Sequence, residues 1–509
     1  MCGILCGINP SYSKIELNKS LHLMDHRGPD YQADFLFPNK LYMGHNRLSI
    51  IDLNPRSHQP FSSDKFHIVF NGEVYNYKEL IKEHHLIVHT SSDTEVILEM
   101  YKKYKVNCLK YFNGMFAFVI YDENNNDIFI ARDRLGIKPL YFYNSTNEWL
   151  FASEIAPLQR LVNSKVDEFG VRQYRKIRMT IKGYTLFSDI KFFPSGHYWL
   201  NGKLKKYWDL DVSSKTCPRD EDIKILIEDA VNIRKRSDVS VGSYLSGGLD
   251  STILSYLLKP EDTWTVGFEN LNEFAWGKLA NSNLKSEHHQ TIVDNEKFLT
   301  TARHMIDKRL EPLSVPNEVL IFLMTMEVKR KNTVVLSGEG ADELFWGYDR
   351  IFKWANRTNN LDVDEFDNYY CYGSNKDNEV LDFALEGLPG ETPLEKLGYY
   401  FQIFHLQGLL RRLDNSTMLC SVEARVPFVD HRLVEMIAGT SFDWKMGHSF
   451  KEPLKRIFKE IIPNEIINRK KIGFPVPLDE IFDLPISNES SMDRWLLFNL
   501  ENFRNFNNY

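Results

Sequence analysis

The sequence predicts a multidomain α/β protein whose first part is strand-rich α+β and whose second part is built on a parallel sheet. The chain has 509 residues, too many for a single hydrophobic core. Short alternating apolar stretches fill the first 205 or so residues. Beyond a polar segment at 209–222, strands alternate with helical patterns, which is typical of a parallel sheet with covered faces. We therefore expect two domains, 1–205 and 206–509.

Strands and one helix dominate the expected first domain. Alternating or continuous apolar runs predict strands at 41–43, 66–70, 116–121, 128–131 and 141–143. Asn71-Gly72 and Asn113-Gly114 punctuate these runs as turns. Asp93 as N-cap, followed by apolar residues at helical spacing from Val96 to Tyr104, predicts a helix. The region 166–191 has no clear helical pattern.

The expected second domain begins with a helix–strand–loop–helix series. The predicted order is a helix at 223–231, a strand at 239–245, a glycine-rich loop and a helix at 251–258, and buried strands follow at 263–268 and 333–336. From about residue 395 the pattern is mostly helical. We expect the polar segment 358–380 to form a loop excursion and residues 502–509 to fray.

Composition and charge exclude several classes of protein. The chain is 43% hydrophobic and 26% charged, and 62 basic against 69 acidic residues give a net charge of −7. This mild acidity argues against a nucleic-acid-binding surface. Apolar runs fall short of the roughly 20 residues that span a membrane, and the N-terminus shows no secretory signal. Six scattered cysteines without a CxxC pair predict reduced thiols in the cytosol.

Cys2 follows the initiator methionine. If Met1 is removed, the Cys2 thiol and a free α-amino group belong to one residue, and the amine can accept the thiol proton near neutral pH. Taken alone, a cysteine here is better explained as a chance residue or a small buried thiol. Its interpretation therefore depends on the rest of the domain.

Four short segments accompany Cys2, and each has a simple structural interpretation. Alone they suggest a salt-bridged turn, a hairpin turn at Asn71-Gly72 and a helix cap. Together with Cys2 they resemble the class II glutamine amidotransferase domain over residues 1 to about 205, which implies an Ntn-hydrolase-type αββα sandwich. The resemblance rests on the segments His26–Asp30, His45–Ile50, Phe70–Asn76 and Ser92–Glu95, extended by Arg132–Tyr141 and Phe193–Gly196.

This resemblance implies a site for glutamine hydrolysis. Cys2 would attack the side-chain amide to form a thioester, and the Asn71 side chain and Gly72 N–H would form the oxyanion hole. Arg47 would clamp the substrate carboxylate. The ammonium end would be held by Asp93, with help from Glu73 and from the backbone around Leu48, Ser49, Ile50 and Ile51.

A second motif, Leu245–Thr252, lies between a predicted strand and a predicted helix. Its consecutive small residues leave backbone N–H groups free to surround a phosphate at a helix N-terminus. It differs from the P-loop because no lysine follows the second glycine. It resembles the pyrophosphate loop of the ATP-pyrophosphatase superfamily.

Three later segments narrow the resemblance. They are Leu336–Leu344, Val422–Asp430 and Arg469–Pro475, with Lys451 and Lys455 ahead of the last. Singly they suggest an acidic turn, a packed β-edge and a solvated basic face. In this order, the chain resembles the glutamine-hydrolysing asparagine synthetases over residues 1 to about 480.

The synthetase resemblance implies the remaining site residues, the cofactor Mg²⁺ and the substrates ATP, aspartate and glutamine. Asp250 and Asp342 would bind Mg²⁺ through hard carboxylate oxygens. Lys451 would neutralise the departing pyrophosphate, and Glu339 would help deprotonate ammonia as it attacks a β-aspartyl-adenylate. Homodimers are common in this family. ATP and pyrophosphate would be held by Leu245, Ser246, Gly247, Gly248, Asp250, Ser251, Val266, Ser337, Gly338 and Lys451.

Two departures leave the acceptor open. Trp346 stands where the family has glycine and is expected to reshape the aspartate or adenylate pocket, and the segment Glu273–Lys278 matches poorly. A related amidotransferase acting on another carboxylate is the alternative. Cys2 disfavours a β-lactam-forming synthetase, which lacks that cysteine. A catalytically silent homologue is disfavoured because the expected site residues are intact.

Overall fold

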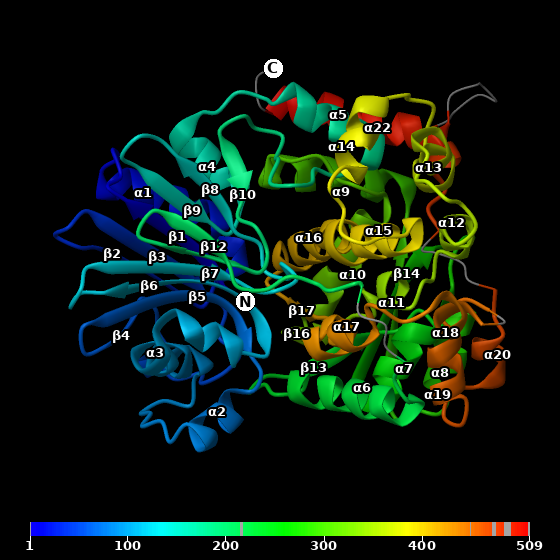
Figure 1. Cartoon of the computed structure of the whole chain (residues 1–509), viewed down its shortest axis with the longest axis horizontal. Coiled ribbons are helices and arrows are strands. Elements are labelled where there is room, and N and C mark those ends of the chain that lie inside the picture. Colours follow the sequence, from blue (N-terminus) through cyan, green and yellow to red (C-terminus); the bar gives the residue numbers. More distant parts are fainter. Residues whose placement is uncertain (1, 214–216, 448, 471–474, 483–489, 507–509) are drawn as a thin grey trace.

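The computed structural model describes residues 2–213, 217–447, 449–470, 475–482 and 490–506. A β-sandwich formed by the first part of the chain lies beside a larger, helix-rich part (Figure 1). The strands of the sandwich end at Lys206, and the first helix of the larger part begins at Asp220. The predicted division after residue 205 therefore cuts the last residue from β12, ahead of the connection at 207–219, and the domain boundary stays a prediction.

Two antiparallel six-stranded sheets form the sandwich. The first has the order β10-β8-β9-β1-β3-β2 and the second β12-β11-β7-β6-β5-β4. Their bounds are β1 Gly3–Ile8, β2 Tyr31–Leu36, β3 Leu41–Arg47, β4 Phe61–Ser63, β5 Phe66–Val74, β6 Gly114–Asp122, β7 Asp127–Arg132, β8 Tyr141–Asn144, β9 Trp149–Ala152, β10 Ile190–Phe192, β11 His197–Leu200 and β12 Lys203–Lys206.

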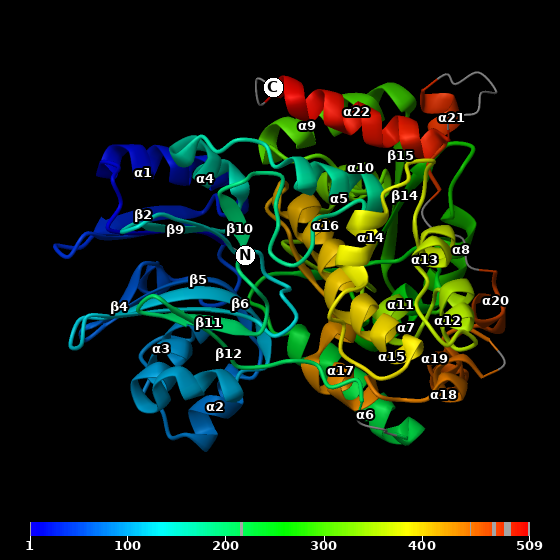
Figure 2. The ribbon, with the colours of Figure 1, turned by 45° about the horizontal axis from the view of Figure 1, so that its top comes forward.

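Helices cover both outer faces, as Figure 2 shows. The first sheet is covered by α1 (Lys14–Leu21) and α4 (Ile155–Val162), and the second by α2 (Tyr77–Glu83) and α3 (Asp93–Tyr104). Alternate residues of β1, β3, β5 and β6 meet between the sheets in a fully buried core. This confirms the expected αββα arrangement.

Asn71-Gly72 lies inside β5 and not at a turn, so that part of the expectation was wrong. β5 pairs with β6 along its whole length, and Gly72 faces Phe116. Gly72 has φ = +149°, and a Cβ there would lie 2.0 Å from the Met115 carbonyl oxygen. Glycine is therefore required by the close approach of β6, and not by a hairpin.

The larger part is built on a five-stranded parallel sheet, as expected. Its order is β15-β14-β13-β16-β17, with β13 Val241–Tyr244, β14 Asp262–Phe268, β15 Glu287–Val293, β16 Val334–Leu336 and β17 Glu423–Arg425. The helices are α6 Asp220–Arg234, α7 Leu249–Leu258, α8 Phe274–Asn281, α9 Asn295–Arg309, α10 Asn317–Val328, α11 Ala341–Leu344, α12 Asp349–Ala355, α15 Pro393–Tyr399, α16 Leu406–Met418, α17 His431–Ile437, α18 Phe442–Met446, α19 Glu452–Phe458, α20 Asn464–Ile467 and α21 Leu478–Ile481.

Four local expectations need correction. Ser92, not Asp93, caps α3, because its side chain accepts the Thr94 N–H. Helix α5 (Glu168–Ile177) occupies the region that lacked a helical pattern. Helices α13 (Val363–Tyr370) and α14 (Asn378–Leu385) replace the expected loop excursion. The last helix, α22 (Ser491–Phe506), includes residues 502–506 of the segment expected to fray, and residues 507–509 lie outside the described residues.

Helices α5, α13 and α14 share local features that the sequence interpretation missed. Asp167, Asp362 and Asp377 cap α5, α13 and α14 through their side chains. Each helix then buries a narrow apolar stripe against its neighbours and exposes a polar face. Within the described ranges, no helix combines the length and apolar character needed to cross a bilayer.

Candidate active sites

Cys2 lies directly before β1, opposite Asn71 of the facing sheet. The Cys2 backbone N–H donates to Asn71 Oδ1 over 3.1 Å, and Arg27 Nε donates to the Cys2 carbonyl over 3.0 Å. Asn71 Nδ2 is buried and has no hydrogen-bond partner among the described residues. The structure thus places an unused amide donor beside the cysteine, which is what an oxyanion hole needs.

The surroundings of the Cys2 thiol disfavour its thiolate form. Burial raises the pKa of Cys2, while the nearby N-terminal charge, the Leu48 N–H and Arg47 oppose that increase. A buried thiol needs a base to become a nucleophile. Because Asn71 Oδ1 already orients the Cys2 nitrogen, a free α-amino group there would be positioned to serve.

Arg47 ends β3 and turns its guanidinium into the following loop. Its nitrogens donate to the carbonyls of Asn54 over 3.3 Å and Asp52 over 2.5 Å. Burial lowers the pKa of Arg47. Within the described part of the chain, no carboxylate lies within 4 Å of the guanidinium, so an anionic ligand would complete its partners.

The loop after Arg47 continues the predicted glutamine site. Leu48, Ile50 and Ile51 are buried, and the Ser49 N–H donates to Asp30 Oδ2 over 2.7 Å. This hydrogen bond fixes the backbone of the loop beside Cys2. The loop is therefore suited to hold a substrate by its main chain.

Asp93 and Glu73 form an acidic pair that lacks a full complement of positive charge. Asp93 Oδ2 accepts the Val74 N–H over 2.9 Å, and burial raises the pKa of Asp93 to about 7. Burial and the nearby Glu423 raise the pKa of Glu73 well above its usual value. Arg425 Nη2 lies 3.5 Å from Glu73 Oε1. A substrate ammonium would supply the missing charge here.

A second site occupies a cleft of about 950 Å³ at the carboxyl ends of β13 and β16. Ser246, Gly248, Asp250 and Ser251 line it where the loop after β13 enters α7. Gly247 has φ = +75°, and a Cβ there would lie 2.3 Å from the Trp276 backbone. This tight turn aims the start of α7 into the cleft, as phosphate binding requires.

Lys451 connects two parts of this cleft. Its Nζ lies 2.5 Å from Asp250 Oδ2 and 2.7 Å from Asp342 Oδ1. Burial lowers the pKa of Lys451, but the two carboxylates more than offset this and raise it, so the ammonium is charged. The phosphate loop and the loop after β16 therefore meet at one cation.

The donor set fits a magnesium ion. Asp250 and Asp342 each direct a carboxylate oxygen at the Lys451 ammonium. The space between the two carboxylates therefore attracts a cation. Hard oxygen ligands beside a phosphate loop are what Mg²⁺ prefers. These two residues are the ones that would hold it.

Glu339 follows β16 and lines the cleft. Arg412 of α16 donates to Glu339 Oε1 over 3.0 Å. Next to it, burial raises the pKa of Glu343 to about 7, and the Tyr348 hydroxyl donates to Glu343 over 2.6 Å. Glu339 is thus a cleft carboxylate held by a specific donor, whereas the buried Glu343 is not among the described lining residues.

Most predicted nucleotide residues line the cleft, but two of them, Gly247 and Val266, are not among its described lining residues. Leu245, Ser337 and Gly338 line it, whereas Val266 is buried in β14 and is not among the described lining residues. Trp264, two positions earlier on the same strand, lines it instead.

Trp346 does not reshape the cleft. Its ring stacks on Phe352 with centroids 4.7 Å apart, and Lys445 Nζ lies 4.6 Å from the ring centroid. Trp346 is 2% exposed and is absent from the cleft's described lining. The ring instead contacts Phe352 of α12 and Phe442 of α18, so the expectation that it forms part of the pocket wall was wrong.

The poorly matching segment does contact the cleft. Glu273 lines it and forms an ion pair with Arg469, whose guanidinium also stacks on Trp276. Arg469 Nη1 donates to the Gly247 carbonyl over 2.9 Å, which ties the basic segment to the phosphate loop. Residues 471–474 of that predicted segment lie outside the described residues.

Buried ion pairs join the two parts of the chain. Asp414 of α16 lies 2.9 Å from Arg27 Nη2 and 3.2 Å from Lys138 Nζ. Arg27 also pairs with Glu154 over 2.9 Å. The sequence reasoning assigned no role to Asp414, Arg412 or Arg425. Asp414 and Arg412 could have been noticed in the sequence because they are charged residues in a segment, LLRRLDNSTM, that also carries apolar residues.

Comparisons with known proteins agree with this geometry. Residues 1–208 match the model of the glutamine amidotransferase domain, and residues 222–493 match the model of asparagine synthase. The chain belongs to the asparagine synthase family. The second match alone spans more than half of the chain.

Similar relatives extend over most of the chain. A putative glutamine-hydrolysing asparagine synthetase of Methanocaldococcus jannaschii is 34% identical over 68% of this chain and 76% of its own length. Asparagine synthetase 3 of Bacillus subtilis is 27% identical over 93% and 87%. A protein named amidase chry2 from Gibberella zeae is 26% identical over 94% and 89%. Family and relatives identify a glutamine-hydrolysing ligase that uses ATP.

Proposed function

We propose that the enzyme makes L-asparagine from L-aspartate, using ATP and the amide nitrogen of L-glutamine. Aspartate is activated as β-aspartyl-AMP, and the products are asparagine, glutamate, AMP and pyrophosphate. A reactive Cys2 thiol needs reducing surroundings, so we propose the cytosol as the compartment.

The first half-reaction takes place at Cys2. Arg47 binds the glutamine carboxylate, and Asp93 with Glu73 binds the ammonium. The α-amino group takes the thiol proton, sulfur attacks the amide carbon, and the Asn71 Nδ2 and the Gly72 N–H stabilise the oxyanion. Ammonia leaves, and water releases glutamate from the thioester.

The second half-reaction takes place in the cleft. The aspartate side-chain carboxylate attacks the α-phosphorus of ATP while the phosphate loop and Lys451 hold the departing pyrophosphate. When bound by Asp250 and Asp342, Mg²⁺ supplies charge neutralisation on the phosphates. Glu339, oriented by Arg412, accepts a proton as ammonia attacks the acyl adenylate.

One observation carries this proposal. Lys451 contacts both Asp250 of the phosphate loop and Asp342, three residues after Glu339. This contact supports the proposal that the pyrophosphate end of the nucleotide and the activated carboxylate that receives ammonia bind in the same cleft. Adenylation followed by amide formation needs this juxtaposition.

Product analysis tests the proposal. Purified enzyme is incubated with ATP, Mg²⁺, glutamine and aspartate, against controls lacking each. We expect asparagine, glutamate, AMP and pyrophosphate in equal amounts. Glutamate without aspartate-dependent pyrophosphate would instead support the alternative, a different carboxylate acceptor.

A further inference from the structure

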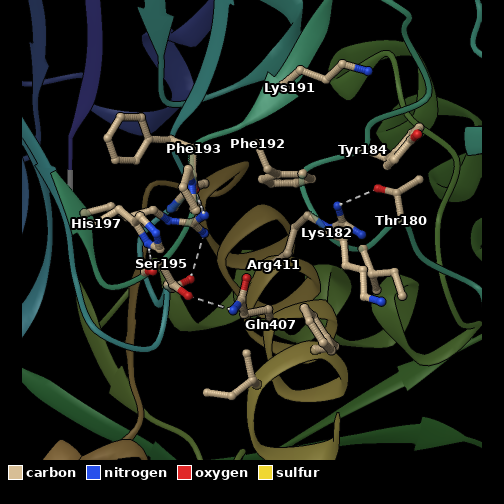
Figure 3. Close-up of a pocket in the computed structure, with 18 of the residues that line it drawn as sticks. Thr180, Lys182, Tyr184, Lys191, Phe192, Phe193, Ser195, His197, Gln407 and Arg411 are labelled. Atoms are coloured by element: carbon tan, nitrogen blue, oxygen red, sulfur yellow. Dashed lines mark hydrogen bonds between the residues drawn. The ribbon is translucent and has the colours of Figure 1, made fainter. Parts of the chain in front are cut away.

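A separate pocket of about 500 Å³ lies between the sandwich and α16. Residues 180–184 and 191–197 form one wall, and Ile403, Gln407 and Arg411 form the other. Figure 3 shows Arg411 reaching from its helix toward Phe192 and Thr180, while Gln407 is joined to Ser195. The volume falls within the range of about 300–1,000 Å³ that is usual for small-molecule sites.

Positive charge dominates this pocket. Five cationic side chains line it, against the single acid Asp209, and they are Arg132, Lys182, Lys191, Lys206 and Arg411. Three of these cations already have partners. Arg132 and Lys182 donate to backbone carbonyls, those of Phe383 and Glu386 in the case of Lys182. Lys206 pairs with Asp209 over 2.6 Å. Lys191 and Arg411 form no ion pair among the described residues, and Lys191 Nζ lies 4.7 Å from the Tyr184 ring centroid, so both cations can take an anionic partner.

Arg411 is held in place without an ion pair. Its guanidinium lies 4.7 Å from the Phe192 ring centroid, and its one described hydrogen bond, to Thr180 Oγ1, is long at 3.4 Å. No carboxylate in the described ranges lies within 4 Å of it. Arg411 does favour the ionised form of the buried Glu311, which is not among the described lining residues.

Aromatic rings supply most of the remaining surface. Phe142, Tyr184, Phe192, Phe193, Trp208, Tyr399 and Phe404 line the pocket. Aromatic rings beside two cations that have no carboxylate partner within 4 Å among the described residues suit a flat apolar body that carries one anionic group.

The pocket shares a wall with the synthetase cleft. Gly408 of α16 lines both cavities. Arg411 faces the pocket, while the adjacent Arg412 holds Glu339 in the cleft. Asp414 of the same helix binds Arg27 and Lys138 of the sandwich.

We propose that this pocket binds a small planar organic anion, an aromatic carboxylate or phosphate ester, and that its occupancy changes the coupling between glutamine hydrolysis and synthesis. The anion contacts Arg411 and Lys191, and the ring stacks among the aromatic side chains. A ligand there would bridge the sandwich and α16. The claim that occupancy changes the coupling rests on the proposed function, whereas the claim that the pocket binds an anion does not.

Binding is tested on the full chain with ATP and Mg²⁺ present, so that the synthetase cleft is filled. The probe is 8-anilinonaphthalene-1-sulfonate, titrated by fluorescence. We expect one saturable site that weakens about tenfold or more in Lys191→Gln/Arg411→Gln and also weakens in Phe192→Ala. The matched control is Lys205→Gln, an exposed lysine on β12 outside the described pocket lining.

Competition distinguishes the two kinds of anion. Indole-3-acetate and phenyl phosphate are each added to the probe complex, and displacement by either supports the site and identifies its preferred group. Unchanged probe affinity in both Lys191→Gln/Arg411→Gln and Phe192→Ala, or displacement by neither competitor, would overturn the binding proposal.

Coupling is tested by the ratio of glutamate formed to pyrophosphate released. At saturating competitor we expect this ratio to change in the wild type and in Lys205→Gln but not in Phe192→Ala. An unchanged wild-type ratio would overturn the claim about coupling while leaving the proposed function intact. Absence of both products without competitor would instead contradict the proposed function.

Discussion

Single side chains in the glutamine site are held in states that a substrate would complete. Asn71 Nδ2 lacks a partner among described residues, and the guanidinium of Arg47 lacks a carboxylate there. The pKa of Asp93 is raised to about 7, chiefly by burial. Glutamine carries an amide, a carboxylate and an ammonium. One bound glutamine would therefore supply a partner to Asn71, Arg47 and Asp93 at the same time.

The raised pKa of Asp93 predicts pH-dependent glutamine binding. Lowering the pH protonates Asp93 and removes the charge that attracts the substrate ammonium, so affinity falls below pH 7. We expect glutamine to bind Cys2→Ala about eightfold more weakly at pH 6 than at pH 7.5, measured by calorimetry without turnover. Cys2→Ala/Asp93→Asn should bind weakly at both pH values, and an equally steep pH profile in that variant would exclude Asp93.

Glu339 is predicted to act only in synthesis. Glu339→Gln keeps the size of the side chain and a hydrogen-bonding oxygen but removes the base. We expect asparagine formation to fall by about 10²-fold or more, while the rate of glutamate formation stays within about twofold. Glu327→Gln, a surface carboxylate that pairs with Arg330, is the matched control. Normal asparagine synthesis in Glu339→Gln would remove its proposed role.

At the scale of elements, α16 is the structural link between the sites. Arg411 of this helix lines the pocket between the sandwich and α16, and Arg412 donates to Glu339. Asp414 pairs with the buried cations of the sandwich. Strand β17 makes a second link, since the Arg425 carbonyl accepts the Ser337 N–H while its side chain approaches Glu73. Both elements touch both sites, so their packing is tied to function.

Asp414→Asn tests the role of α16. The change leaves Arg27 and Lys138 buried with less negative charge, and breaking a buried pair costs about 3–5 kcal/mol. We expect a lower midpoint of unfolding in urea and more glutamate formed per asparagine. Asp382→Asn, at an exposed position on α14, should change neither. A stable, fully coupled Asp414→Asn enzyme would contradict this account of the interface.

At the scale of the whole molecule, local order along the chain was predictable and long-range contact was not. The strand–loop–helix order around residues 245–252 was predictable because a strand, small residues and a helix follow one another in sequence. Asn71-Gly72 was misread as a turn because its requirement for glycine comes from β6, some 40 residues away. The Asp414 pairs join residues 387 and 276 positions apart, which no local pattern reveals.

The same distinction applies to the two departures from the family pattern. Trp346 looked decisive in sequence, yet it packs against Phe352 outside the cleft lining. Glu273 looked like a weak match, yet it lies in the cleft and pairs with Arg469. Both side chains are buried, so the cavity that a side chain faces, and not its burial or the size of the substitution, decides whether it lines the cleft.

The central claim is that one chain hydrolyses glutamine at Cys2 and uses the ammonia in the second site. The most direct measurement is asparagine formation by wild type and Cys2→Ala, each with glutamine or with ammonium chloride as nitrogen donor. The account predicts that Cys2→Ala makes no asparagine from glutamine but retains the wild-type rate with ammonium. Asparagine formed from glutamine by Cys2→Ala, or loss of the ammonium-dependent rate in a folded variant, would contradict it.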